Sequence, residues 1–344
     1  MQLSAGKLWS LRRLADPGGR FKMTAVDQRP PFFKLIRDKR ATDQVDYADV
    51  VALKVALART LAPLSSAMLL DPVWAYPNAI DDVRPSQGLI LTLEDHAFDE
   101  DAGGRRSRPI GDWSVEKIKR LGADGVKVLI WYRPDADPAV CAHQEAFVEA
   151  VGRACAAHDL CFVLELLVYP FAGAAGPDAV DDPAARPGLV VESLRRFTDP
   201  RFGVDLFKLE SPVAADLVPD PDRGPGAADC QAWFDRMGAL TTRPWVMLSA
   251  GADMEAFRRI LVYAYRAGAS GYLCGRAIWW RAAQNFPDMA ALERALTDEG
   301  IAYMREINAL TDDLAAPWTD HGAFAGGALL ADAGPDFVHA YGRA

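Results

Sequence analysis

Long hydrophobic runs are absent from this chain of 344 residues. None approaches the roughly 20 apolar residues that a membrane-spanning helix needs. The first residues also lack the apolar core of a signal peptide. We therefore expect no membrane partner and a cytoplasmic location. Residues 1–20 instead place Leu8, Leu11 and Leu14 at helical spacing, which predicts a short helical lead-in.

Positive charge is also scarce. The chain has 38 Lys and Arg against 47 Asp and Glu, a formal net charge of -9. A nucleic-acid-binding face needs a basic surface, so we expect no nucleic-acid partner. An anionic small-molecule substrate stays possible, because a local site can oppose the sign of the whole protein.

Two common cofactor signatures are missing. The five cysteines are odd in number and form no Cys-x-x-Cys pair, which favours reduced, buried thiols and argues against zinc. No Gly-x-Gly-x-x-Gly follows the first strand-like run, as a dinucleotide-binding fold would require. The first absence makes zinc an unexpected ligand, and the second counts against an open dinucleotide-binding sheet.

Short apolar runs alternate with helical patterns along most of the chain. Strands are predicted at 21–26, 66–70, 88–93, 124–131, 160–168, 204–212, 244–248 and 270–274. Helices are predicted at 47–61, 114–121, 138–158, 189–197, 228–240 and 254–267. Eight βα units predict an α/β fold, a (β/α)8 TIM barrel, with an open doubly wound sheet as the alternative. We expect a lead-in at 1–20, the barrel at 21–315 and a tail at 316–344, with a surface loop at 172–188.

Three of the predicted strands each carry a charged residue that looks buried: Lys127, Glu165 and Lys208. A lysine attacks carbonyls only when neutral, and a second lysine nearby favours loss of one proton. Alternate barrel strands share layers, so Lys127 and Lys208 are expected to lie close together, with Glu165 between them as an acid or base. Glu210 competes with Glu165 for that role. A purely structural ion-pair network is the alternative.

Polar residues follow several strands, at the end where barrel enzymes carry their sites. Asp27-Gln28-Arg29 follows the first strand, Ser249-Ala250-Gly251 the seventh and Gly275-Arg276 the eighth. The last two loops together predict a phosphate site, since small residues let the backbone approach an anion and an arginine can grip it. Tight turns with a surface salt bridge are the alternative.

The motifs occur in an order that resembles the class I tagatose 1,6-bisphosphate aldolases, within the deoxyribose-phosphate-aldolase-like Schiff-base barrels. The matching pieces are Ala25-Val26-Asp27-Gln28-Arg29, Gly122-Ala123-Asp124-Gly125-Val126-Lys127, Phe162-Val163-Leu164-Glu165, Thr198-Asp199-Pro200-Arg201-Phe202, Asp205-Leu206-Phe207-Lys208-Leu209-Glu210, Leu248-Ser249-Ala250-Gly251 and Leu273-Cys274-Gly275-Arg276-Ala277. The resemblance runs from about Phe21 to Leu310.

The resemblance implies a metal-independent aldol cleavage of a sugar phosphate, with a protonated imine as the electron sink, so we expect neither a metal nor another cofactor. Lys208 would form the Schiff base, Glu165 would be the acid/base, and Lys127 would assist by its charge. Asp27, Gln28 and Arg29 would position the substrate. The dihydroxyacetone-phosphate end would be held by Ser249, Ala250, Gly251, Gly275 and Arg276.

Some positions depart from the family pattern. Pro30-Pro31 would stiffen the loop after the first strand, Arg133 stands where the family tends to carry an acid, and Trp279-Trp280 adds bulk. These residues and the Gly-rich loop at 101–109 are expected near the far end of the substrate. A sulfofructose-phosphate aldolase, with Arg29 or Arg133 meeting the sulfonate, stays open. So do a non-catalytic sugar-phosphate-binding protein and a homo-oligomer using exposed Trp318 or Tyr341.

Overall fold

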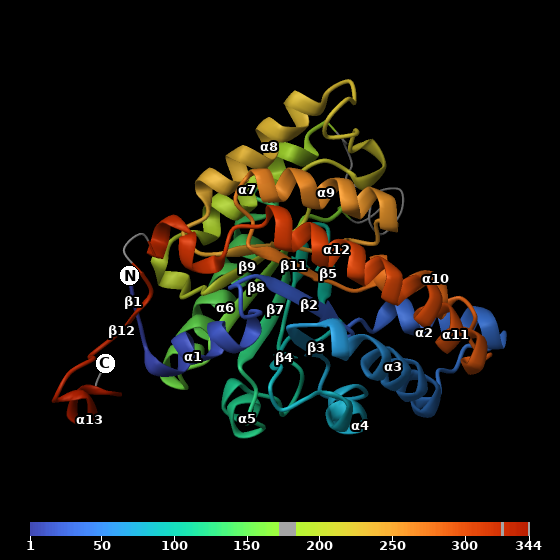
Figure 1. Ribbon diagram of the computed structural model, residues 1–344, viewed down its shortest axis with the longest axis horizontal. Helices are drawn as coiled ribbons and strands as arrows, with labels where there is room; N and C mark the ends of the chain where they lie inside the picture. Colours follow the sequence, from blue (N-terminus) through green and yellow to red (C-terminus); the bar gives the residue numbers. More distant parts are fainter. Residues whose placement is uncertain (172–183, 325–326, 343–344) are drawn as a thin grey trace.

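A closed barrel of eight parallel strands forms the centre of the molecule, seen in a computed structural model that describes residues 1–171, 184–324 and 327–342 (Figure 1). Around the barrel the strands follow the order β10-β11-β2-β3-β4-β7-β8-β9. They are β2 (Phe21–Ala25), β3 (Ala67–Leu70), β4 (Gly88–Thr92), β7 (Gly125–Trp131), β8 (Cys161–Leu167), β9 (Leu206–Leu209), β10 (Trp245–Met247) and β11 (Gly271–Cys274). The prediction of a TIM barrel is confirmed, because every predicted strand contains one of these.

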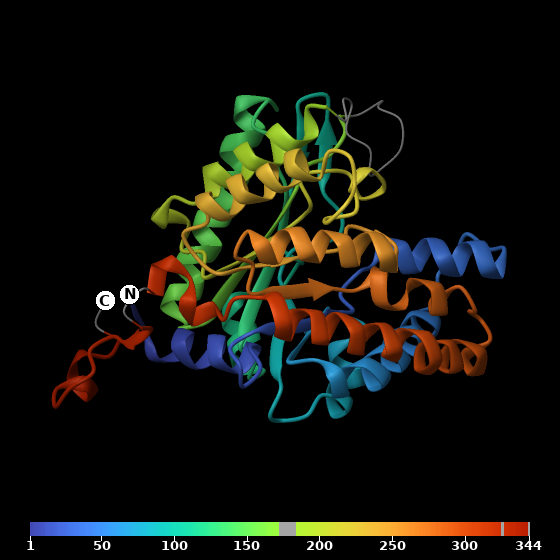
Figure 2. The ribbon, with the colours of Figure 1, turned by 45° about the horizontal axis from the view of Figure 1, so that its top comes forward.

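Helices surround the barrel, as right-handed βα crossovers require (Figures 1 and 2). They are α2 (Pro30–Arg40), α3 (Tyr47–Leu61), α4 (Tyr76–Ala79), α5 (Val115–Arg120), α6 (Pro138–Ala157), α7 (Arg186–Phe197), α8 (Ala227–Leu240), α9 (Met254–Arg266), α10 (Arg276–Ala283), α11 (Met289–Ala295) and α12 (Ile301–Leu314). The six predicted helices are confirmed. Ser114 caps α5 by accepting a hydrogen bond from the Lys117 amide, as its residue type favours.

Three local predictions differ from the structure in whole or in part. Pro30 and Pro31 do not stiffen a loop; they begin α2, because a proline in the first turn gives up no helical hydrogen bond. The loop expected at 172–188 includes the first turn of α7, which begins at Arg186, and its residues 172–183 lie outside the described part of the chain. The Gly-rich loop at 101–109 contains part of a hairpin, β5 (Asp99–Asp101) with β6 (Gly104–Arg106).

The amino ends of the barrel strands are covered by both ends of the chain. Helix α1 (Ala5–Leu14) buries Leu11 and Leu14 in a cluster that also contains Trp318 and Phe324. Trp318 is therefore not an exposed aromatic, as the sequence analysis assumed; 3% of it is accessible. The short strands β1 (Gln2–Leu3) and β12 (Leu329–Leu330) pair in parallel and bring the two termini to the same side (Figures 1 and 2).

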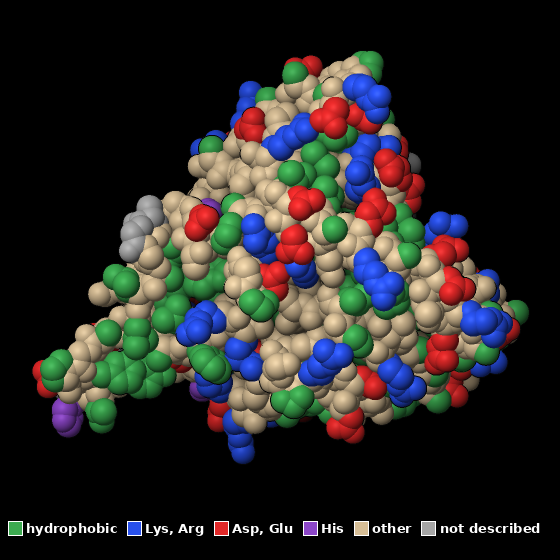
Figure 3. Space-filling view, in the orientation of Figure 1, with side chains coloured by type: hydrophobic (Ala, Val, Ile, Leu, Met, Phe, Trp, Pro, Cys, Tyr) green, Lys and Arg blue, Asp and Glu red, His purple; other side chains and the backbone are tan. Residues whose placement is uncertain are grey.

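The last described residues, 327–342, form an arm that projects from the body of the molecule (Figure 1). It ends in α13 (Phe337–Ala340), and apolar side chains gather on its surface (Figure 3). Val338 is 83% exposed and Tyr341 46%. The division at 20/21 and 315/316 stays a prediction.

Neither a membrane-spanning helix nor a metal-binding cluster is found among the described residues. No helix among them combines the length and apolar character needed to cross a membrane. No group of three or more His, Cys, Asp or Glu residues in this part of the chain is arranged to hold a metal ion. The five cysteines are free thiols; Cys141 is partly exposed and the others are buried.

Candidate active site

The carboxyl ends of the barrel strands open into a cavity of about 730 Å³, within the range of small-molecule sites. Nearly all of the predicted site residues line it: Asp27, Gln28, Arg29, Lys127, Glu165, Lys208, Ser249, Ala250, Gly275 and Arg276. Gly251 lies beside them, since a Cβ built on it would come within 3.1 Å of the Arg276 guanidinium. The structure thus brings together residues from loops and strands far apart in the sequence.

Lys127, Glu165 and Lys208 lie on the consecutive barrel strands β7, β8 and β9. One oxygen of Glu165, Oε2, is 2.8 Å from Lys127 Nζ and 2.9 Å from Lys208 Nζ. All three side chains are buried. The predicted placement of a carboxylate between two lysines is therefore observed.

The two lysines differ in their surroundings. Lys127 Nζ also contacts Asp27 Oδ2 at 2.9 Å and Glu94 Oε1 at 2.8 Å, so three carboxylates surround it. Burial works to lower the pKa of Lys127, but the carboxylates outweigh it and raise that pKa above its ordinary value. Lys127 is thus held as an ammonium and does not lose the proton that two neighbouring lysines were expected to shed. Lys208 pairs with Glu165.

The pKa values of the acidic side chains in the cavity are shifted in different directions. Burial acts to raise the pKa of Asp27 and of Glu165, but Lys127 and Lys208 prevail and hold both values below the ordinary range. For Glu94 burial wins against Lys127 and Arg29, so its pKa is raised. Asp27 and Glu165 are therefore carboxylates at neutral pH.

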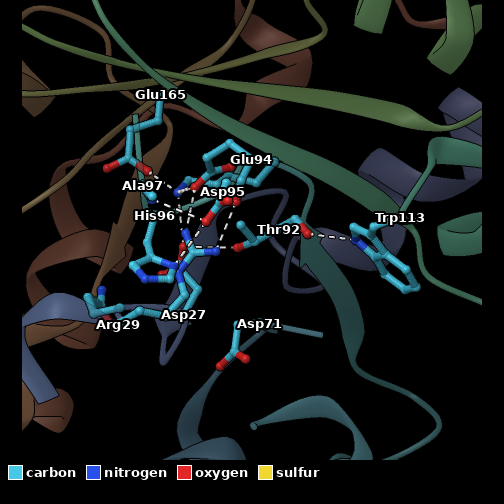
Figure 4. Close-up of polar contacts among 12 residues, drawn as sticks. Asp27, Arg29, Asp71, Thr92, Glu94, Asp95, His96, Ala97, Trp113 and Glu165 are labelled. Atoms are coloured by element: carbon cyan, nitrogen blue, oxygen red, sulfur yellow. Dashed lines mark hydrogen bonds and ion pairs between the residues drawn. The ribbon is translucent and has the colours of Figure 1, made fainter. Parts of the chain in front are cut away.

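Glu94 was missed by the sequence analysis. It directly follows the third predicted strand and is 3% exposed. Its side chain and that of Asp27, which both follow strands, converge with that of Glu165 on β8 (Figure 4). An acidic residue at the carboxyl end of a barrel strand was the available signal.

Several polar atoms in the cavity wall have no partner. Among the described residues, Asp27 Oδ1, Gln28 Oε1, Arg29 Nε and Glu94 Oε2 are buried and make no hydrogen bond. Buried polar groups in folded proteins are nearly always satisfied. A cluster of exceptions in one cavity indicates a site built for a polar ligand.

A buried ion pair fixes the loop that carries Asp27. Lys54, from α3, donates to the backbone oxygens of Val26 at 2.7 Å and Gln28 at 2.8 Å, and pairs with Asp71. Asp71 lies apart from Asp27 and Glu94 (Figure 4) and accepts from the amides of the turn that follows β3. The sequence analysis did not single out Lys54, because only the fold brings it under that loop.

One side of the cavity has features of an anion site. Ala250 and Gly251 have φ values of 46° and 90°, which bend the backbone after β10 sharply. Helix α10 begins at Arg276 with Gly275 as its N-cap. A Cβ on Gly275 would lie 2.5 Å from the Ala25 oxygen, so glycine alone fits. The Arg276 guanidinium lies against Gly251, which brings an arginine and a helix N-terminus together.

A second arginine faces the same cavity from the other side of the barrel. Arg105, on the β5–β6 hairpin, lies 4.7 Å from the ring centre of Phe98, 4.8 Å from that of Trp131 and 4.9 Å from that of Tyr169. Trp131 ends β7, which stands four places from β11 in the closed order of eight strands. The cavity therefore has Arg276 and Arg105 on opposite sides, and of these two the sequence analysis identified only Arg276.

Two residues considered earlier lie elsewhere. Glu210 accepts from the Val168 amide at 2.6 Å and pairs with Arg186, so it holds the start of α7 and does not compete with Glu165. Arg133 pairs with Asp135, donates to the Tyr169 oxygen and stacks on Phe171. It is not among the cavity-lining residues. The sequence analysis placed both in the site because they lie near the ends of predicted strands. A side chain beyond the end of a strand can point away from the barrel axis.

Comparison with known proteins identifies the family. Residues 23–281 match the model of the DeoC/LacD family aldolases. A tagatose 1,6-diphosphate aldolase of Streptococcus agalactiae serotype V is 32% identical over 329 residues, which cover 93% of this chain and 100% of that protein. A protein of the same name from Staphylococcus aureus is 31% identical over 325 residues, covering 92% of this chain and 99% of that protein.

Solved structures support the fold. A Schiff-base-forming fructose-1,6-bisphosphate aldolase superposes with a TM-score of 0.56 at 18% identity, covering 89% of this chain and 99% of that one. A fructose-bisphosphate aldolase from Plasmodium falciparum gives 0.66 at 12% identity, covering 92% and 98%. The barrel is thus shared with class I aldolases, and the sequence match is specific. The chain belongs to the DeoC/LacD family of aldolases and is an aldehyde-lyase.

Proposed function

We propose that the protein cleaves a ketose 1,6-bisphosphate by a class I mechanism, with Lys208 as the Schiff-base residue and tagatose 1,6-bisphosphate as the preferred substrate. The products would be dihydroxyacetone phosphate and glyceraldehyde 3-phosphate. The observation that carries the proposal is a buried lysine, Lys208, 2.9 Å from Glu165 and open to a cavity that has an arginine on either side. The names of the relatives from streptococci and staphylococci support the choice of sugar.

The chemistry follows from the positions of three side chains. Neutral Lys208 attacks the C2 carbonyl of the ketose, and loss of water leaves a protonated imine. Glu165 takes the proton of the C4 hydroxyl while the C3–C4 bond breaks, and the electron pair of that bond moves toward the imine nitrogen as an enamine forms. The aldehyde leaves, C3 is protonated, and water releases dihydroxyacetone phosphate and free Lys208. Lys127, held as an ammonium, stabilises the charge that develops on oxygen.

The two anionic ends of the substrate fit the two sides of the cavity. We assign the phosphate next to the ketone to Ser249, Ala250, Gly251, Gly275 and Arg276, because a helix N-terminus and an arginine meet there. Arg105 would then face the distal phosphate across the barrel. Arg133 lies outside the cavity wall and does not favour a sulfonate-bearing substrate, whereas Arg29 lines the cavity with an unpartnered Nε and keeps a sulfofructose-phosphate aldolase as the alternative.

A cleavage assay tests the proposal. Purified protein is mixed with tagatose 1,6-bisphosphate and with fructose 1,6-bisphosphate, and dihydroxyacetone phosphate is measured by reduction with a coupling enzyme. We expect turnover of both sugars with the higher kcat/KM for tagatose 1,6-bisphosphate. Absence of cleavage of either bisphosphate would contradict the proposed substrate class, and a preference for the fructose compound would contradict the choice of sugar.

A further inference from the structure

Glu94 stands at a fixed position in the cavity wall. Its backbone forms an isolated bridge with Pro109, and its carbonyl oxygen accepts a hydrogen bond from Arg29 Nη1 at 2.9 Å. Its side chain points toward the same centre as Asp27 and Glu165 (Figure 4). The carboxylate is thus aimed into the cavity by contacts on both sides.

The two oxygens of Glu94 are used differently. Oε1 is 2.8 Å from Lys127 Nζ and 3.2 Å from Arg29 Nη2. Oε2 is buried and makes no hydrogen bond to any described residue. Asp27 has the same arrangement: Oδ2 accepts from Lys127 at 2.9 Å and from Thr92 at 3.0 Å, while Oδ1 is buried without a partner. Each carboxylate therefore anchors one oxygen to the protein and leaves the other for a ligand.

The missing donor is a neutral group. The acidic side chains of Asp27, Glu94 and Glu165 already contact basic side chains, Lys127, Lys208 and Arg29. A phosphate would be repelled by the unpartnered oxygens. A hydroxyl is neutral, donates one hydrogen bond and fits an acceptor that lacks only a donor.

We propose that Glu94 recognises a sugar hydroxyl on one of the two carbons that flank C4. Glu94 and Asp27 together then restrict the enzyme to polyhydroxylated ketoses. This inference rests on the proposed function and names the feature of the substrate that this part of the site reads. The hydroxyl at C4 gives its proton to Glu165. The hydroxyl at C3 or C5 meets the free oxygen of Glu94.

The Glu94→Gln variant separates recognition from structural support. The introduced glutamine side chain has one oxygen, and Lys127 and Arg29 both require an acceptor, so that oxygen takes the place of Oε1. The amide nitrogen then stands where Oε2 was, and a donor replaces the acceptor that the hydroxyl needs. Packing and the contact to Lys127 are kept, while the hydroxyl loses its acceptor.

The experiment compares two enzymes on three substrates. We measure kcat and KM of the wild type and of Glu94→Gln with the ketose 1,6-bisphosphate and with its 3-deoxy and 5-deoxy analogues. The wild type is expected to lose at least about tenfold in kcat/KM on one analogue, because hydrogen bonds to charged groups are strong. Glu94→Gln should lose a similar factor on the parent sugar and little on that analogue. An equal loss on all three substrates would overturn the proposal and leave Glu94 a structural support for Lys127.

A matched control and a trapping readout separate the possible failures. Asp205→Asn alters another buried carboxylate, at the opposite end of the barrel, and should leave the discrimination between the three substrates unchanged. Borohydride trapping with dihydroxyacetone phosphate, which keeps the C3 hydroxyl and has no C5, reports Schiff-base formation at Lys208 and should label both the wild type and Glu94→Gln. If the wild type is not trapped, the proposed function fails. If both are trapped but the substrate-dependent loss is missing, only the role of Glu94 fails.

Discussion

The two ends of the barrel both bury charged side chains, but they use them differently. At the amino end, Asp124 accepts from Arg13 through Oδ1 and from the Leu89 amide through Oδ2. Asp205 there accepts from Lys7 and from the Phe162 amide, both through Oδ2, and its Oδ1 is not among the buried atoms that lack a partner. At the carboxyl end, Asp27 and Glu94 each have one buried oxygen that no described residue satisfies.

The difference distinguishes a structural ion pair from a binding site. A structural pair satisfies its carboxylate within the protein, because an unpaired buried group costs stability. A site leaves part of that capacity for the ligand. The electrostatics differ too: burial keeps the pKa of Asp205 raised in spite of Lys7, whereas Lys127 and Lys208 overcome burial and hold the pKa of Asp27 low.

Replacing a lysine at the carboxyl end of the barrel should abolish activity, whereas replacing one at the amino end should lower stability. Lys208→Met should lower kcat by at least about 1,000-fold, because it removes the nucleophile. Its stability should change little, since Glu165 keeps Lys127 as a partner. Lys7→Met should keep kcat but lose about 3–5 kcal/mol of unfolding free energy, because Asp205 stays buried without its cation. Steady-state kinetics and urea denaturation of both variants measure the contrast, and a large loss of kcat in Lys7→Met would contradict it.

Lys127→Met should destabilise the site end in a pH-dependent way. In the wild type the lowered pKa values of Asp27 and Glu165 contribute stability above their ordinary pKa of about 4, and this is lost as pH falls below it. Without Lys127, burial should raise the pKa values of Asp27 and Glu165 above those of the unfolded chain. The folded protein then becomes more stable as these two groups take up protons. We expect a loss of about 3–5 kcal/mol at pH 7 and a smaller loss at pH 5. Urea denaturation at both pH values measures it, and equal losses would contradict the account.

Arg105→Leu should distinguish the two sides of the cavity, which carry Arg105 and Arg276. It removes the cation opposite Arg276, so KM for the bisphosphate should rise about 10- to 100-fold. KM for the matching ketose 1-phosphate should stay nearly constant, because that sugar lacks the distal phosphate. Arg106→Leu is the control: Arg106 is the next residue on the hairpin, pairs with Asp101 and is not among the cavity-lining residues. Equal effects on both sugars would remove Arg105 from the distal site.

Truncation after Phe324 should have the smallest effect. It removes the projecting arm but keeps Trp318 and Phe324 in the cluster that covers the amino end of the barrel. The arm buries little, with Val338 83% exposed, so unfolding free energy should fall by about 1 kcal/mol. Trp318→Ala should cost more, about 3–5 kcal/mol, because it leaves a cavity in that cluster. Thermal denaturation of both variants tests the ranking, and kcat should be unchanged in each.

The sequence predicted the barrel because its signals are local. Apolar strands, helix caps such as Ser114 and the polar residues that follow each strand can all be read within a few positions. The lysines and Glu165 were found in the same way, since a charge inside an apolar strand is conspicuous. The family resemblance added their roles.

The missed features depend on contacts between distant segments. Lys54 looks like any helix residue until the fold places it under the loop of Asp27. Arg105 lies in a hairpin that the sequence presents as a Gly-rich loop, and its aromatic neighbours come from three separate segments. Glu94 was visible at a strand end, but its unpartnered oxygen was not. Sequence patterns locate charges along the chain, whereas only the assembled barrel shows which of them remain unsatisfied.

The central claim is that Lys208 forms the Schiff base, and covalent trapping tests it most directly. The protein is incubated with dihydroxyacetone phosphate and sodium borohydride, and intact mass is followed by peptide mapping. We predict one adduct per chain on the peptide that contains Lys208, and none in Lys208→Met. An adduct on Lys127 would keep the class I mechanism but reverse the roles of the two lysines. No adduct, with binding of dihydroxyacetone phosphate shown separately, would contradict the Schiff-base mechanism.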